Sequence, residues 1–520
     1  MGKTRDMGSV GRRTVGVVTL ILLLALGFAS RSDAGGATGA KYPRTVNWGA
    51  AGTASTTTLG PTTTTVGPTT TTSTTTLPSA STTVPMPAAA GVPVEAQQMS
   101  GDWSPVVDPQ ATYGTAVVIN SGALSVQTLS QPGAYLLNVR LRSDAARVAL
   151  TMNGQQIDVA DLYGGSWRTV TVPVYVNGTP TWGIQPLPGI GYTPQPVYVD
   201  WLSLDTTTPG YTTVGNKIID PNGNAVIPRG VNRDSLEANP NGWHLSDNDF
   251  EAMRLWGASM VRLPLSQQFW LSTSCNYDPG YAARVDQMVQ SITKRGMIAL
   301  VDLHTTAAGQ ACGTPRLAMM ADDYSVQFWT QVANRYKSNP LVAFDLFNEP
   351  HDITEAQWHD GGMIGSPAWH AVGMQQLYDT VRATGANNPV FIGGYSWAYR
   401  IDVALRRPVD GFAIVFSSHI YNPPGTGPLP PNIDSVIPPV AASYPVVFGE
   451  FGTNAGTGTY NANVIAYAES HGIGWAAWIW DQLPTQFALI TDWVSYTPTA
   501  AGQPVRDALW KARGWTTWGQ

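Results

Sequence analysis

From residue 210 onward, apolar strand-like runs alternate with amphipathic stretches, and this alternation limits the possible folds more than any other feature. Eight runs follow in order: AVIPRGVN, ASMVRLPL, MIALVDLH, LVAFDLFNE, PVFIGGY, FAIVFSSHIY, YPVVFGEF and GIGWAAWIW. The stretches between them have helical periodicity, as in YAARVDQMVQSITKRG. Strands that are apolar throughout belong to parallel sheets covered on both faces. Eight of them over about 300 residues predict an α/β fold, a closed (β/α)8 TIM barrel, across 210–516.

Polar and aromatic side chains stand at the ends of six of these runs. They are Arg262, His304, Asn348, Glu349, His419, Tyr421, Glu450, Trp478 and Trp480. In a barrel of this kind the functional residues lie at the carboxyl ends of the strands. A set distributed over so many strands at one edge is not explained by solvation, and we interpret it as an active site. The two histidines alone would also suit a barrel rim or a metal, but Asn348, Arg262 and Tyr421 are poor neighbours for zinc.

The motifs VRLP, DLH, FNEPH, SHIY, FGEFG and WIW, in this order, closely resemble glycoside hydrolase family 5, the cellulase family of retaining barrel enzymes. The resemblance covers about 215–510. It implies that Glu349 is the acid/base and Glu450 the nucleophile, and it implies no cofactor for catalysis. It also implies the supporting roles: Asn348 would hold the 2-hydroxyl of the sugar, Arg262 and Tyr421 would bond the nucleophile, and His304 and His419 would line the cleft. A tryptophan of the eighth run would floor the sugar site; Trp478 is favoured, and Trp480 is the alternative.

The chemistry of glycoside cleavage requires the same pair of residues. Retention needs one carboxylic acid and one carboxylate about 5 Å apart. Two carboxyls at this distance do not ionise equally, so their pKa values separate. Arg262 beside Glu450 would favour the charged form of Glu450 and leave the proton on Glu349.

The expected substrate is a β-1,4-linked glucan cut by an endo-acting glucanase through double displacement. A β-mannanase or another β-glycanase of the same family is the alternative, because the loops decide the substrate. Four aromatic residues in these loops are either subsite platforms or packing: Trp358, Trp369, Trp397 and Tyr399. A non-catalytic glycan-binding protein of the cell surface is a candidate from another class, against which the intact carboxyl pair argues. We expect a monomer.

Residues 90–207 carry a different pattern. Alternating runs such as AYLLNVRLR and RTVTVPVYV are separated by turns, which predicts an all-β antiparallel sandwich. In VEAQQMSG, GAYLLNVRLRS and VYVDWLSLD the segment resembles carbohydrate-binding modules of families 6 and 35. The resemblance implies a structural calcium ion held by Glu95 and Asp200, although Gln97 replaces a second Glu. Trp167 and Trp182 are expected to stack against sugars; the alternative is that both are core residues, or that the domain is a spacer.

The first 89 residues predict export. Residues 1–35 have a basic start, the apolar run TVGVVTLILLLALGFAS and small residues after it, the order of a secretory signal peptide. The run is shorter than the roughly 20 residues of a full span, so a cleaved signal is favoured over a membrane anchor. Residues 36–89 read as a Thr/Pro-rich linker. We expect a secreted protein, with membrane contact only if the signal is retained.

Two further expectations follow from the composition. Cys275 and Cys312 are the two cysteines, and in an oxidising compartment they are expected to form one disulfide, the alternative being two unpaired thiols. The formal net charge is −6, with 12% charged residues and 10% aromatic residues. This balance excludes a nucleic-acid partner and favours a polysaccharide.

Overall fold

The computed structural model describes residues 88–89, 91–176, 178–189, 193–206, 210–422, 428–453 and 455–515. The predicted signal (1–35) and nearly all of the predicted linker (36–89) lie outside the described residues. Within the described part, no helix combines the length and the apolar character that crossing a membrane requires.

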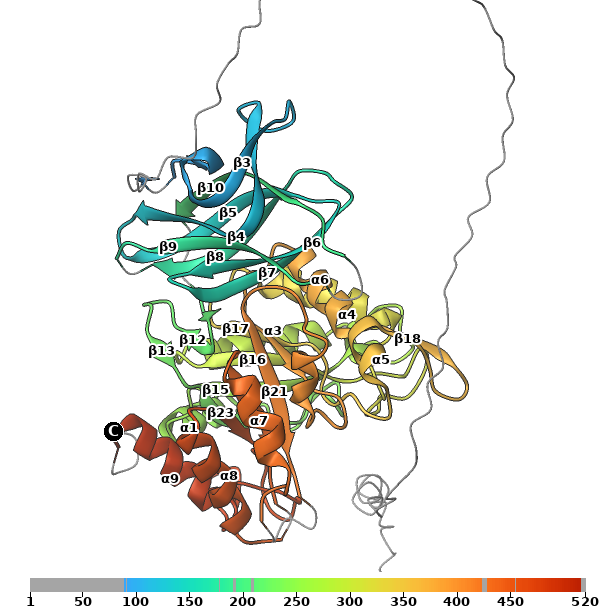
Figure 1. The fold of residues 1–520 in the computed structure, drawn as a ribbon. Helices are drawn as coiled ribbons and strands as arrows, with labels where there is room; N and C mark the ends of the chain where they lie inside the picture. The colour runs from blue at the N-terminus through green and yellow to red at the C-terminus, as the bar shows by residue number, and fades with distance from the viewer. Residues whose placement is uncertain are drawn as a thin grey trace, which may run out of the picture. The chain divides into compact units, whose positions relative to one another are not determined.

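Eight parallel strands close into a barrel, as the alternating runs predict. They are β14 (Arg229–Asn232), β15 (Met260–Ser266), β16 (Ile298–Thr305), β17 (Val342–Asp345), β20 (Val390–Gly393), β21 (Ile414–Ile420), β22 (Val446–Phe451) and β23 (Gly474–Ala477). Each strand pairs with the next, and β23 pairs with β14 to complete the ring. Figure 1 labels β15, β16, β17, β21 and β23 among these strands. Each of the eight predicted runs contains one of them, except that β15 and β16 end one residue after their runs.

Helices connect the strands and supply the outer part of the core. They are α1 (Asp247–Leu255), α2 (Gln267–Trp270), α3 (Tyr281–Thr293), α4 (Asp323–Tyr336), α5 (Glu355–Asp360), α6 (Met374–Ala383), α7 (Ile433–Ala441), α8 (Thr459–Ser470) and α9 (Gly502–Arg513). On α3 the predicted apolar face of Val285, Met288, Val289 and Ile292 is buried. A capping box of Asp322 and Ser325 starts α4, so its first N–H groups are satisfied.

The alternation of side chains along each strand places polar groups inside the barrel mouth. Met260, Leu300 and Ala343 belong to one buried apolar cluster. Two positions further along the same strands stand Arg262, Asp302 and Asp345. Because every second residue of a strand faces the same side, these polar residues continue the inward face above the apolar layer. A packed apolar layer therefore supports a polar one at the carboxyl ends of the strands.

The N-terminal part is all β, and its core is separate from that of the barrel. Ten strands form one sheet, ordered β7-β6-β9-β4-β10-β5-β8 with β1, β2 and β3 attached. They are β1 (Ala88–Ala89), β2 (Val94–Glu95), β3 (Ser100–Val107), β4 (Thr115–Leu129), β5 (Gly133–Arg142), β6 (Ala145–Met152), β7 (Gln155–Tyr163), β8 (Arg168–Val176), β9 (Thr181–Leu187) and β10 (Val197–Thr206). Buried and half-buried residues alternate along β5, as the sequence pattern predicts.

Two shorter features complete the framework. The strands β11 (Thr212–Val214), β12 (Lys217–Ile219) and β13 (Ala225–Val226) form a small antiparallel sheet before β14. Cys275, in the loop after α2, forms a disulfide with Cys312, in the loop after β16, with a Cα–Cα distance of 4.8 Å. The disulfide ties together two loops that follow neighbouring barrel strands.

Candidate active site

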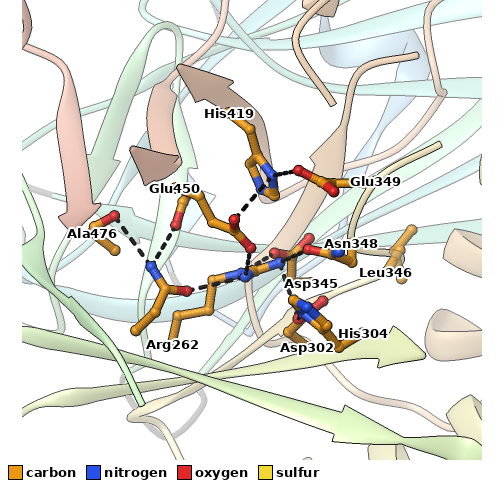
Figure 2. A network of polar contacts seen from close by, with 12 residues as sticks. Arg262, Asp302, His304, Asp345, Leu346, Asn348, Glu349, His419, Glu450 and Ala476 are labelled. Atoms are coloured by element: carbon orange, nitrogen blue, oxygen red, sulfur yellow. Dashed lines mark hydrogen bonds and ion pairs between the residues drawn. The ribbon is translucent and has the colours of Figure 1, made fainter. Parts of the chain in front are cut away.

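Glu349 and Glu450 converge at the mouth of the barrel. Glu349 lies four residues after the end of β17, and Glu450 lies in β22. His419 of β21 stands between them, its Nδ1 atom 2.9 Å from Glu349 Oε1 and 3.6 Å from Glu450 Oε2 (Figure 2). One oxygen of each carboxyl and one His419 nitrogen all lie within 4.8 Å of one another. This closeness fits the short carboxyl separation of retaining glycosidases and not the wider one of inverting enzymes.

Arg262 of β15 is the centre of the site. Its three guanidinium nitrogens make four hydrogen bonds and one further ion pair, with Asp302. Nε contacts Asp345 at 2.8 Å; Nη1 contacts Glu450 at 2.6 Å and Asn232 Oδ1 at 3.0 Å; Nη2 contacts Asn348 Oδ1 at 2.9 Å and Asp302 at 3.0 Å. The side chain is fully buried. Its orientation is therefore fixed by acceptors from four other barrel strands or the residues that follow them (Figure 2).

Glu450 receives donors on both carboxyl oxygens. Arg262 bonds Oε1, and the Tyr421 hydroxyl donates to Oε2 at 3.1 Å. Burial raises the pKa of Tyr421 well above its usual value, so this hydroxyl keeps its proton and stays a donor. Charge-assisted hydrogen bonds of this kind stabilise a carboxylate. Gly449 precedes Glu450, and a Cβ atom there would lie 3.1 Å from His419 Nε2, so glycine permits this close approach of β21 and β22.

Glu349 has a contrasting environment. Its side chain is 13% exposed, and its Oε1 shares a hydrogen bond with His419 Nδ1. Burial raises the pKa of Glu349, while His304 and Arg262 oppose the rise. Burial also lowers the pKa of His419 to about 3, so that histidine is neutral at physiological pH. One carboxyl is thus built to hold a proton and the other to hold a charge.

Asp302 and Asp345 belong to this network although they are absent from the sequence-predicted site. Both are buried, and both contact Arg262. Asp302 also contacts His304 Nδ1 at 2.7 Å, which orients that ring. A signal for both is present in the sequence: each is a charged residue inside an otherwise apolar strand, in VDLH and in FDLFNE. A charge in such a position needs a partner, and Arg262 provides it.

Asn348 and the strand-eight tryptophans complete the cleft. The Oδ1 atom of Asn348 is taken by Arg262, so its amide NH2 group remains as a donor. Trp478 is half-buried and stacks on His304, with ring centroids 5.5 Å apart and planes inclined by 6°. Trp480 has no exposed surface and packs against Trp256 at 4.7 Å. The expectation that Trp480 floors a sugar site is therefore wrong, because its ring belongs to the core; Trp478 is the ring a ligand can reach.

Of the four aromatic residues predicted as subsite platforms or packing, one is fully buried and three are half-buried. Trp358 is fully buried, and its indole N–H donates to the Gly393 carbonyl at 2.9 Å, so it packs beneath its loop. Trp397 is half-buried and stacks on His351 with centroids 3.7 Å apart. Trp369 and Tyr399 are also half-buried and rest against the core.

The N-terminal region contradicts one sequence expectation and leaves two as predictions. Trp182 is 1% exposed, with its indole N–H donating to Thr128, so it is a core residue and not a sugar platform. Trp167 is half-buried, and its indole N–H donates to Asp108 at 3.1 Å. Asp200 is paired with Arg140 at 2.9 Å and accepts from Thr112. The calcium ion expected at Glu95 and Asp200 stays a prediction, with a guanidinium already beside Asp200.

Three side chains of the catalytic mouth also offer ligand atoms to a cation. Among the described residues, Glu349, His419 and Glu450 are the group of three or more metal-ligating side chains that lie close enough together. The Arg262 guanidinium touches Glu450 and adds a positive charge to this place. That charge disfavours a metal ion and suits the carboxyl pair.

A closed (β/α)8 barrel with two carboxyls facing each other at its carboxyl-terminal mouth is the arrangement that barrel glycosidases require. Residues 219–483, more than half of the chain, match the family model described as Cellulase (glycosyl hydrolase family 5). The chain belongs to this family.

Two curated relatives and one solved structure are similar to parts of this chain. Endoglucanase 1 of Saitozyma flava is 29% identical over 174 residues, which are 32% of this chain and 49% of the relative. An endoglucanase of Paenibacillus polymyxa is 26% identical over 265 residues, 45% of this chain and 64% of the relative. The chain thus spans about half of one relative and just under two thirds of the other. A β-glucanase of Saccharophagus degradans in complex with cellotetraose has a TM-score of 0.48 and 22% identity, covering 59% of this chain and 95% of its own.

Replacing Arg262 with Met should destabilise the fold in a pH-dependent way. The change leaves Asp302, Asp345 and Glu450 buried without their counter-ion, which costs about 3 to 5 kcal/mol of unfolding free energy. Burial raises the pKa of Asp302 and of Asp345 to about 7, so both carry protons at about pH 5 and need no counter-ion there. The loss should therefore be large at about pH 8 and smaller at about pH 5, measured by urea unfolding.

Arg254→Met is the matched control. Arg254 forms an ion pair with Glu251 in which the side chains are 37% and 39% exposed. Its loss should cost less than about 1 kcal/mol and should be the same at both pH values. An equal loss for Arg262→Met at both pH values would contradict the central place given to the buried network.

Proposed function

We propose that the chain is a secreted, retaining endo-β-glycosidase that hydrolyses β-1,4-linked glucan by double displacement. The observation that carries this proposal is the asymmetry of the carboxyl pair. Glu450 is bonded by Arg262 and Tyr421, whereas Glu349 is bonded by a neutral histidine. The names of the relatives, both endoglucanases, favour glucan over mannan as the substrate. The intact carboxyl pair favours an enzyme over a non-catalytic glycan-binding protein.

In the first step, the charged Glu450 attacks the anomeric carbon of the sugar and forms a glycosyl ester. Glu349 gives its proton to the leaving glycosidic oxygen, whose bond to the anomeric carbon breaks. Arg262 and Tyr421 hold the attacking carboxylate in one orientation. Trp478 offers its accessible ring to the apolar face of the sugar, and the NH2 group of Asn348 faces the bound hydroxyls.

In the second step, Glu349 changes its role. Glu450 is neutral as an ester, so Glu349 no longer has a charged carboxylate as its neighbour, and its pKa falls. The ionised Glu349 takes a proton from water, and the resulting hydroxide attacks the anomeric carbon and releases Glu450. The two neutral histidines beside the pair add no charge that would oppose this cycle.

Replacing Glu450 with Gln should abolish hydrolysis of carboxymethylcellulose, with a loss of at least about a thousandfold in kcat, while binding of oligosaccharide remains.

Glu349→Ala should lose turnover but recover it with azide on aryl glycosides, because an activated leaving group needs no acid and azide replaces the water that Glu349 would activate. Hydrolysis of carboxymethylcellulose and of aryl glycosides is measured with the purified protein. The culture medium is tested for the same activity, because residues 1–35 predict export.

Glu251→Gln serves as the matched control, since Glu251 is an exposed glutamate of α1 that pairs with Arg254. It should keep normal turnover. A Glu450→Gln protein with near-normal turnover would remove the nucleophile from this proposal. If the unmodified protein cleaves galactomannan faster than carboxymethylcellulose, the proposed activity is that of a β-mannanase and not of a glucanase.

We also propose that the N-terminal all-β region binds glycan through the face around Trp167 and Tyr198. Both rings are half-buried and are joined by Arg142, whose guanidinium lies 5.3 Å from the Trp167 ring and 4.3 Å from the Tyr198 ring. Arg142 is itself fixed by Asp108 at 3.0 Å. Rings held in place by charged side chains, with part of their surface accessible, are suited to stacking against sugars.

Trp167→Ala and Tyr198→Ala should each weaken adsorption of the whole protein to insoluble cellulose, by roughly tenfold for the loss of one stacking ring, and leave hydrolysis of soluble oligosaccharides unchanged. Tyr163→Ala is the matched control, because this tyrosine is 59% exposed and lies outside the set around Arg142. Adsorption isotherms measure the effect. Unchanged adsorption by both variants would make the region a spacer.

A further inference from the structure

The site holds more acid than its central guanidinium can balance. Asp302, Asp345 and Glu450 each contact Arg262, and Glu349 stands next to Glu450 across His419. Three ionised carboxylates against one guanidinium would leave two uncompensated negative charges in a buried place. An uncompensated buried charge costs far more than holding a proton. Protons must therefore remain on part of this cluster at neutral pH.

The hydrogen bonds indicate which carboxyls hold these protons. Both oxygens of Glu450 accept donors, from Arg262 and from Tyr421. By contrast, Asp302 Oδ1 and Asp345 Oδ1 are buried and have no hydrogen-bond partner. An unpartnered oxygen in an apolar setting is a poor place for negative charge and a suitable place for a proton. In agreement, burial raises the pKa of both aspartates to about 7.

We propose that Asp302 and Asp345 are positioning residues for the acid/base pair, and that the negative charge of Asp302 keeps Glu349 protonated, which extends the active range to higher pH. This inference rests on the proposed roles of Glu349 and Glu450. Asp302 and Asn348, the residue before Glu349, contact the same Arg262 nitrogen, Nη2. Asp302 also interacts electrostatically with Glu349, and each carboxyl makes ionisation of the other less favourable. Once Asp302 is charged, the general acid therefore loses its proton only at a higher pH.

Titratable and charged groups from several elements act on Asp302 or on the residues that it contacts. Those that act on Asp302 itself are Arg262 from β15, His304 from β16, Asp345 from β17 and Glu349 from the segment after β17. Those that interact with His304 are His419 from β21, Glu450 from β22 and Glu237 from the segment after β14. His304 and His419 are neutral because burial lowers the pKa of both. Arg262 keeps its charge, since the three carboxyls outweigh its burial and raise its pKa. The groups that change charge near neutral pH are thus the carboxyls.

Asp302→Asn and Asp345→Asn test the inference through pH profiles of kcat/KM on a soluble cello-oligosaccharide. For Asp302→Asn, the alkaline limb should move to lower pH by roughly half a unit to one unit, because the charge that protects the acid is gone. The acidic limb should stay in place, since Asp302 is already neutral there. Asp345→Asn should give a smaller shift in the same direction, because Asp345 contacts Arg262, interacts electrostatically with Asp302, and acts on Glu349 through them.

Asp322→Asn is the matched control for a merely structural loss. Asp322 is a buried carboxyl that caps α4 and bonds Gln267, and it has no contact with Arg262. This variant should lose stability without moving either limb. Since the aspartate variants could fail to fold, infrared difference spectra of the unmodified protein between about pH 5 and about pH 9 provide a second measurement. A band of protonated carboxyl should disappear with a midpoint near 7. It should do so in an Asp158→Asn/Asp410→Asn double variant as well, which removes the two other carboxyls whose pKa burial raises to about 7 and about 8.

The outcomes separate this inference from the proposed function. If Glu450→Gln keeps its turnover, the carboxylate roles fail, whatever the profiles show. If Glu450→Gln is inactive while Asp302→Asn has the alkaline limb of the unmodified protein, the inference alone is overturned. The absence of a protonated carboxyl band near neutral pH would overturn it as well, because every carboxyl of the cluster would then already be ionised.

Discussion

The buried guanidinium of Arg262 is the interaction on which the rest of the site depends. It makes four hydrogen bonds and an ion pair with Asp302, and these partners come from the strands that surround it or from the residues just after them. A guanidinium held by this many partners has one orientation, so Glu450 and Asn348 are fixed relative to each other. The barrel provides this geometry because parallel strands bring their carboxyl ends to one face.

The same network explains why two chemically identical carboxyls differ. Glu450 is surrounded by donors, which favour its charge, while Glu349 is buried against a neutral imidazole, which favours its proton. Stability is given up for this arrangement, since buried acids at Asp302 and Asp345 cost free energy when they ionise. The apolar layer of Met260, Leu300 and Ala343 beneath these aspartates is buried.

The sequence predicts the barrel and most of the cleft, because both follow from local patterns. Apolar runs predict the strands, and the polar residues at their ends predict the barrel mouth. Glu349, Glu450, Arg262 and His419 are therefore predicted as site residues from the sequence alone. The sequence does not show which of Trp478 and Trp480 is accessible, because they stand two positions apart at the end of the same strand. Only the packing against Trp256 makes Trp480 a core residue. Trp182 fails as a sugar platform for the same reason, as alternation does not tell which face of a sheet is covered.

The most direct test of the central claim is to trap the glycosyl ester. A cellobioside with fluorine at carbon 2 and an activated leaving group slows the second step, so the ester should accumulate, and peptide mass spectrometry should place the sugar on Glu450. A sugar on Glu349, or hydrolysis that inverts the anomeric configuration and leaves no labelled peptide, would contradict the claim that Arg262 holds Glu450 as the attacking carboxylate.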